Sequence, residues 1–100
     1  MLTEADILSA LRDCYDPELP LNIVDLGLIQ RLQVEPDFDA PGTGIPGVPS
    51  RYHAHITLFA PGSDEAANAQ LAAQVENRLL GVQAISRVTI TLLPALFSIL

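Results

Sequence analysis

Apolar residues recur at helical spacing in two parts of the chain. From Thr3 to about Asp13 they fall three or four positions apart, and Thr3 is well placed to cap the start of a helix. In the second part, Ser63 is the expected N-cap and an apolar stripe runs on to Gly81, a residue type that commonly follows the last helical turn. The pattern therefore predicts two amphipathic helices.

Three further segments have the pattern of strands. Residues 29–35 alternate apolar with polar side chains, and residues 52–60 and 87–93 are the second and third predicted strands. The first two are separated by residues 36–50, which contain four prolines and three glycines. Such a segment forms neither a helix nor a central strand, so we expect a long, mobile hairpin connection.

The element order is helix, strand, strand, helix, strand, which favours an α+β fold. We expect a two-layer sandwich in which a small mixed three-stranded sheet carries both helices on one face, as a single domain over residues 1–100. Shared periodicity assigns the core to the inward side chains of these elements, at Leu11, Leu32, Ile56, Leu58, Leu71, Val75, Val88 and Ile90.

Composition and charge limit the kinds of partner that this chain can bind. The formal net charge is −7 with only five Lys and Arg residues, which counts against nucleic acid, while a basic protein or a cation stays possible. No apolar run reaches the roughly 20 residues that span a bilayer, so no membrane association is expected. The acidic first residues do not resemble a signal peptide, and the single cysteine, Cys14, fits a reducing cytoplasmic compartment.

Three stretches then carry a resemblance to a known family. The stretch "DPELPLNIVDLGLI" is followed by a strand, "ITLFAPGS" begins the second helix, and "VTITLLP" comes last. In this order they resemble the small iron–sulfur cluster assembly domain family, which includes PaaD, SufT and MIP-type proteins, from about Ile7 to Pro94. The resemblance implies the α-β-β-α-β fold, a part in delivering or assembling iron–sulfur clusters, and assembly machinery or a recipient apoprotein as partner.

The sequence departs from this family at two positions. The turn before the second helix usually reads P-G-C-P in the family, and here Ser63 stands in the place of the cysteine. The aromatic residue after the last strand is usually tryptophan, whereas this chain offers only Phe97. Since a serine hydroxyl is a poor substitute for thiolate, we expect no iron–sulfur cluster on the chain itself and no other cofactor.

The candidate functional surface comprises Asp16, Glu18, Asp25, Thr57 and Ser63. One interpretation of the acids is a cluster for a cation or a basic partner. The other is local, with Asp16 capping free backbone donors and Asp25 fixing a tight turn before Gly27 through Asx-type hydrogen bonds. For Ser63, helix capping is favoured over a role as a nucleophile.

The remaining chemistry-bearing residues are expected to be structural. His53 and His55 share one strand face and make half a metal site, but no third ligand follows at a recognisable spacing, so no metal ligands are assigned. A pair of histidines facing solvent, opposite inward Ile56 and Leu58, is the favoured interpretation. Cys14 falls on the apolar face of the first helix and is expected to behave as a small hydrophobe.

The leading hypothesis is a non-enzymatic adaptor that acts through protein contacts. Phe97 and Ile99 form a candidate interface in the apolar tail, and a homodimer through this tail is expected. Two alternatives stay open: an interaction module without an iron–sulfur role, and a hydrolase that uses Ser63 with His53 or His55.

Overall fold

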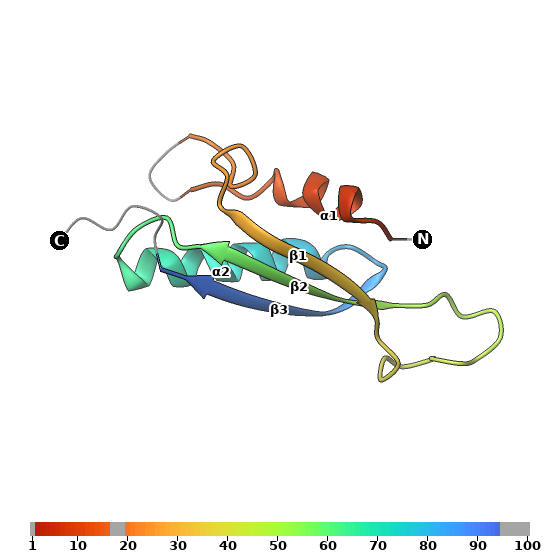
Figure 1. Cartoon of the computed structure of the whole chain (residues 1–100). Coiled ribbons are helices and arrows are strands. Elements are labelled where there is room, and N and C mark those ends of the chain that lie inside the picture. Colours follow the sequence, from red (N-terminus) through yellow and green to blue (C-terminus); the bar gives the residue numbers. More distant parts are fainter. Residues whose placement is uncertain (1, 17–19, 95–100) are drawn as a thin grey trace.

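The computed structural model of this chain describes residues 2–16 and 20–94. They form five elements, α1 (Glu4–Leu11), β1 (Ile29–Pro36), β2 (Tyr52–Phe59), α2 (Glu65–Leu80) and β3 (Ile85–Leu93) (Figure 1). The order α-β-β-α-β and the α+β class confirm the predicted fold. The strand boundaries move by at most two residues from those that the sequence pattern indicates.

Helix α1 begins with the predicted cap. The Thr3 hydroxyl accepts a hydrogen bond from the Asp6 amide (3.2 Å), and the Asp6 carboxylate accepts one from the Thr3 amide (2.9 Å). This reciprocal pair satisfies two amide groups that the first helical turn leaves unpaired. Ile7, Ala10 and Leu11 are the buried residues of the helix.

Helix α2 corrects two expectations about its ends. The N-cap is Asp64, whose carboxylate accepts from the amides of Ala66 (3.0 Å) and Ala67 (3.4 Å), so Ser63 is not the N-cap. An ionised carboxylate also suits the positive end of the helix dipole. At the other end Gly81 has φ −74, a right-handed conformation, and it is therefore the C-cap rather than a left-handed glycine beyond it.

The sheet is mixed, with β2 in the centre. Strand β1 pairs with β2 in antiparallel register and β3 pairs with β2 in parallel register, and α2 connects the two parallel strands. Figure 1 shows the three strands lying side by side as a twisted layer, with α1 and α2 beside it. Along β2, residues 54, 56 and 58 are buried while 53, 55 and 57 are only partly covered. The core therefore lies on one face of the sheet, and the other face is open.

The core joins both helices to the sheet. Leu11, Ile56, Leu58, Leu71 and Val75 are fully buried, as the sequence pattern predicts. The predicted core residues Leu32, Val88 and Ile90 pack against this cluster but remain partly exposed, since β1 and β3 are the edge strands. Ile23 and Ile85 are large, fully buried side chains that the pattern did not assign to the core.

The connection between β1 and β2 is attached to β3 at its base. The Asp37 side chain is buried and accepts hydrogen bonds from Ser86 Oγ (2.7 Å), Arg87 Nη2 (2.9 Å) and the Asp39 amide (3.1 Å). The Asp37 amide donates to the Arg51 carbonyl (2.8 Å), and this hydrogen bond joins the two ends of the connection. Beyond this base the segment extends away from the sheet (Figure 1), and its mobility stays a prediction.

Asp37→Asn should make the stability of the domain less dependent on acid pH. The Ser86 hydroxyl first, and then the Asp39 amide and Arg87, lower the pKa of Asp37 below its ordinary 3.8, while burial opposes them. A carboxylate with a lowered pKa stabilises the fold above its unfolded value and loses that contribution as the pH falls through the folded value. In urea unfolding, the wild type should be the more stable at pH 7, and the difference should shrink below pH 3.8. A constant difference across this range would contradict the ion-pair account.

Candidate functional site

The segment that contains "NIVDLGL" forms one tight helical turn. The Leu28 amide donates to the Ile23 carbonyl (3.1 Å), and the Gly27 amide donates to the Val24 carbonyl (3.0 Å). Gly27 has φ 73, the left-handed conformation that this pair of hydrogen bonds requires. Ile23 is fully buried, so the turn is fastened to the core at its centre.

The polar residues of this turn bond to each other. The Asp25 amide donates to Asn22 Oδ1 (2.9 Å), and Asn22 Nδ2 donates to Asp25 Oδ2 (2.8 Å). The prediction that the Asp25 carboxylate accepts a backbone hydrogen bond in this turn was wrong. The carboxylate accepts from the Asn22 side-chain amide, and it is Asn22 that caps the turn. Asp25 is exposed, so its carboxylate also faces solvent.

Two of the predicted site residues lie in connections at the same end of the sheet. The Phe59 amide donates to the Leu28 carbonyl (2.8 Å), which joins the Asp25 turn to the end of β2. Ser63 is exposed in the connection that follows β2. Figure 1 shows both connections at the end of the sheet where β2 and β3 finish. The structure thus places Asp25 and Ser63 on one end of the molecule.

The other predicted site residues have different positions. Thr57 lies on the open face of β2, opposite Arg31 of β1 and Thr91 of β3. Asp16 is partly buried, and its amide donates to the Leu21 carbonyl (3.1 Å) beside the same turn. The predictions at Glu18, Phe97 and Ile99 fall on residues outside those that the structure describes.

Cys14 belongs to the core, as predicted. It is fully buried and its thiol lies 4.0 Å from the Gln74 carbonyl of α2. The adjacent Tyr15 amide donates to Gln74 Oε1 (2.9 Å), which holds this part of the chain against the middle of α2. Cys14 therefore lies far along the helix from Ser63 at its start.

Cys14 should react slowly with thiol reagents while the protein is folded. Burial raises the pKa of the Cys14 thiol, and only the thiolate is nucleophilic. Iodoacetamide labelling at neutral pH, followed by intact mass, should give little product in buffer and complete labelling in denaturing urea. Rapid labelling of the folded chain would show that the thiol is accessible and would contradict this packing.

The two histidines are not a simple solvent-facing pair. His53 and His55 lie on the open face as predicted, with ring centroids 3.9 Å apart, but the His53 side chain is only 12% exposed. His55 Nε2 lies 2.8 Å from Glu35 Oε1, and His53 Nε2 lies 2.7 Å from Thr89 Oγ1. Burial, and then neighbouring His55 and Arg87, lower the pKa of His53, while the hydrogen bond with His55 lowers the pKa of Glu35.

Neither histidine is placed to activate Ser63. His55 precedes the end of β2 by four residues, which is about 13 Å along a strand at roughly 3.3 Å per residue. Both rings are also hydrogen-bonded to side chains of the neighbouring strands, His53 to Thr89 and His55 to Glu35. A nucleophile needs its base within hydrogen-bonding reach, so this arrangement does not support the hydrolase alternative.

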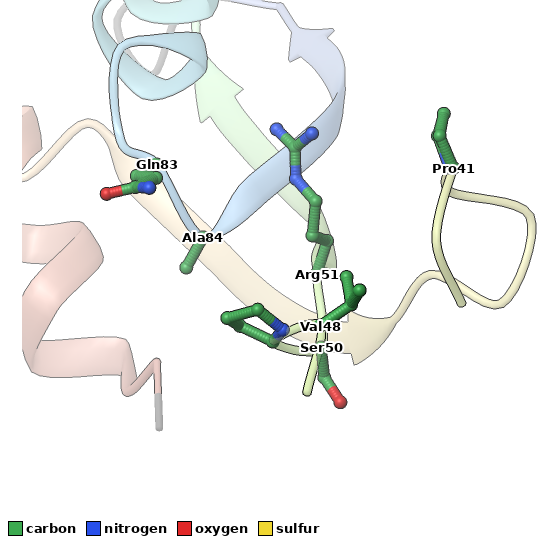
Figure 2. Close-up of a pocket in the computed structure, with 7 residues that line it drawn as sticks. Pro41, Val48, Ser50, Arg51, Gln83 and Ala84 are labelled. Carbon is green, nitrogen blue, oxygen red and sulfur yellow. The ribbon is translucent and has the colours of Figure 1, made fainter. Parts of the chain in front are cut away.

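A hollow of about 550 Å³ opens between the β1–β2 connection and the turn before β3. Pro41, Val48, Arg51 and Ala84 are among its lining residues, and Figure 2 shows the Arg51 side chain extending between them. The guanidinium donates through Nη2 to the Ile85 carbonyl (2.9 Å). Arg51 thus helps to fasten the base of this connection to β3. Neither helix in residues 2–16 and 20–94 has the length and hydropathy of a membrane-spanning segment.

A family model and one relative each match about a third of this chain. A family model described as "Iron-sulfur cluster assembly protein" matches residues 4–39, which contain α1, the Asp25 turn and β1. Over 35 residues the chain is also 54% identical to an "Fe-S protein maturation auxiliary factor" of Porphyromonas gingivalis. That match covers 35% of this chain and 33% of the relative, so it spans about a third of each.

Both matches are described by iron–sulfur cluster assembly or maturation, and each covers about a third of this chain. Two solved structures share the fold of this chain. A domain of unknown function, DUF59, from Bacillus anthracis superposes with a TM-score of 0.62 at 24% identity, covering 90% of this chain and 73% of that one. Rv1466 from Mycobacterium tuberculosis, described as associated with Fe–S complex assembly and repair, gives 0.55 at 27% identity, covering 89% and 66%.

The iron–sulfur assembly match ends before two of the candidate site residues. Asp16 and Asp25 lie inside residues 4–39, whereas Thr57 and Ser63 lie beyond this range.

The sequence pattern missed a group of side chains that the fold brings together. Glu35 is opposite His53 in the β1–β2 register, and only knowledge of that register could have placed it beside the histidines.

Proposed function

We propose that this chain is a non-enzymatic accessory protein of iron–sulfur cluster assembly or maturation, and that it acts through protein contacts. The observation that carries the proposal is the match over residues 4–39 to the assembly family, together with 54% identity over 35 residues to a maturation auxiliary factor. The partner would be a component of the assembly machinery or an apoprotein that receives a cluster, in the cytoplasm.

The proposed contact surface is the end of the sheet that presents Asp25 and Ser63. Asp25 is exposed on a turn whose backbone is fixed by the buried Ile23 and the left-handed Gly27. A fixed turn loses little conformational entropy when a partner binds, which favours recognition by a protein. Asp16 lies beside the same turn, and Glu18 belongs to this acidic stretch in sequence.

The chain itself is proposed to hold no cluster. Cys14 is buried in the core, and the helix start that carries cysteine in similar proteins has Ser63 here. A hydroxyl stays protonated near neutral pH and is a hard ligand, whereas iron–sulfur clusters are held by soft thiolates. The cluster is therefore cargo that passes between other proteins, and this chain would bring them together.

Deletion of the gene tests the function directly. In the source organism grown with limited iron, the deletion should lower the activity of 4Fe–4S enzymes per amount of enzyme protein. Wild-type chain should restore it, Asp25→Lys should restore it poorly, and Glu76→Lys, at an exposed position on α2, should serve as the charge-matched control. Unchanged cluster content in the deletion strain would contradict the function, and full rescue by Asp25→Lys would contradict the surface.

A dimerisation module without an iron–sulfur role is the second candidate. The expected homodimer through Phe97 and Ile99 involves residues outside the described ranges, so it stays a prediction. The two candidates differ in the deletion experiment, because a pure dimerisation module would leave 4Fe–4S enzymes fully loaded.

A further inference from the structure

Three side chains that suit a transition metal lie together on the open face of the sheet. Glu35 comes from β1, and His53 and His55 come from β2. One oxygen of Glu35 and one ring nitrogen of each histidine lie within 4.8 Å of one another. The cross-strand register brings them together, since Glu35 is directly opposite His53 and the two histidines are alternate residues on one face.

The distances between these atoms are close to those of a bound ion. Ligands about 2.0–2.1 Å from a tetrahedral Zn²⁺ lie roughly 3.3 Å from each other. Here Glu35 Oε1 is 2.8 Å from His55 Nε2 and 3.8 Å from His53 Nδ1. The two imidazole rings lie against each other with centroids 3.9 Å apart, so side-chain rotation that separates them would bring all three atoms onto one ion.

A further residue orients the first histidine. Thr89 of β3 lies with its hydroxyl 2.7 Å from His53 Nε2. If Nε2 carries the proton and donates it to Thr89, Nδ1 presents its lone pair on the side of Glu35. Such an outer hydrogen bond fixes the tautomer of a metal-binding imidazole in known sites.

The surroundings leave space and suitable charge for a cation. The Glu35 side chain is 60% exposed, so water can reach a fourth coordination position. The charge of Arg87 acts on both Glu35 and His53, and its guanidinium is paired with Asp37 at 2.9 Å and lies 3.8 Å from Asp39. The repulsion that Arg87 would exert on a metal ion is thereby reduced.

We propose that Glu35, His53 and His55 bind one divalent first-row transition metal ion, with water completing the coordination. Two imidazoles and one carboxylate suit both Zn²⁺ and Fe²⁺, and the general affinity order favours Zn²⁺. Mg²⁺ and Ca²⁺ prefer sites made of oxygen ligands, so they should bind far more weakly. This site is independent of the proposed contact surface and of the proposed function.

The test is metal titration of the purified chain without an affinity tag. His53 and His55 are the only histidines in the sequence and Cys14 is the only cysteine, so few other soft ligands compete. Calorimetry with Zn²⁺ should give one ion per chain, and Co²⁺ should give the visible absorbance of a tetrahedral site. Anaerobic competition between Fe²⁺ and Zn²⁺ then shows which ion the site prefers.

Variants on the exposed sheet face assign the ligands. His53→Ala, His55→Ala and Glu35→Gln should each weaken Zn²⁺ binding by at least about tenfold, and Thr89→Val should weaken it by about 10–100-fold with the stoichiometry unchanged. Gln33→Ala, on the same face opposite His55, and Cys14→Ser are the controls and should bind as the wild type does. Circular dichroism checks the folding of each variant.

Three outcomes would overturn the site. They are no binding of Zn²⁺ or Fe²⁺ by the wild type, equal affinity in the double variant His53→Ala/His55→Ala, and Mg²⁺ binding as tight as Zn²⁺ binding. Each of these results leaves the deletion experiment on iron–sulfur enzymes unaffected, so the two proposals can fail separately.

Discussion

Leu71→Ala should lower the free energy of unfolding by about 2–5 kcal/mol. Leu71 is fully buried on the face of α2 that contacts the sheet, within the cluster that contains Leu11, Ile56 and Leu58. Removing its branched end takes apolar atoms out of a close-packed interior and leaves a cavity that neighbouring strands cannot fill. The loss is large for a chain of 100 residues, because the free energy of unfolding of a folded protein is only about 5–15 kcal/mol.

Urea unfolding followed by circular dichroism measures this loss. Leu80→Ala is the matched control, since Leu80 is on the same helix and is 45% exposed. The same chemical change there should cost clearly less, within about 1 kcal/mol. Equal losses at the two positions would mean that α2 does not pack through the Leu71 face, and the two-layer architecture would then be wrong.

Gly27→Val should lower the free energy of unfolding by about 1–3 kcal/mol. Apart from Gly27 and its two chain neighbours, no residue has an atom within 4 Å of the place that a Cβ would occupy, so the cost is not a clash with packed side chains. It comes from φ 73, which a β-branched residue rarely adopts. Because the left-handed residue ends the Asp25 turn, the strain would also disturb the proposed contact surface.

The same substitution at a second glycine, Gly62, is the control that distinguishes backbone strain from a general effect of replacing glycine by valine. Gly62 also has open space around its Cβ position, and it is not among the glycines with positive φ. Gly62→Val should therefore change the urea midpoint much less than Gly27→Val does. A Gly27→Val chain as stable as the wild type would show that the turn does not use a left-handed residue.

The element order could be predicted from the sequence because local signals agreed with the fold. The apolar period of α1, its Thr3 cap and the alternation in residues 29–35 each gave the same answer as the structure. The start of α2 was missed by one residue because Ser63 and Asp64 are both good caps. Only the geometry of the turn after β2 decides which side chain reaches the free amides.

The candidate site was harder to predict because it depends on pairs of residues far apart in the sequence. The two hydrogen bonds between Asn22 and Asp25 are local in sequence. The pattern nevertheless gave no sign that the Asn22 side chain would cap the turn by accepting from the Asp25 amide. Glu35 lies beside His53 and His55 because β1 and β2 pair in one particular register, and a 15-residue connection separates the two strands in sequence. Asp37 likewise meets Ser86 only after β3 has joined the sheet.

Anaerobic reconstitution with iron and sulfide tests whether this chain holds an iron–sulfur cluster of its own. The measured quantity is acid-labile sulfide bound per chain, with visible absorbance, because iron at the His53 and His55 site would carry no sulfide. The unmodified chain should stay colourless and free of sulfide, and Ser63→Cys should create a thiol at the helix start that responds to metal. Stable brown absorbance with bound sulfide in the unmodified chain, lost in Cys14→Ser, would contradict the account.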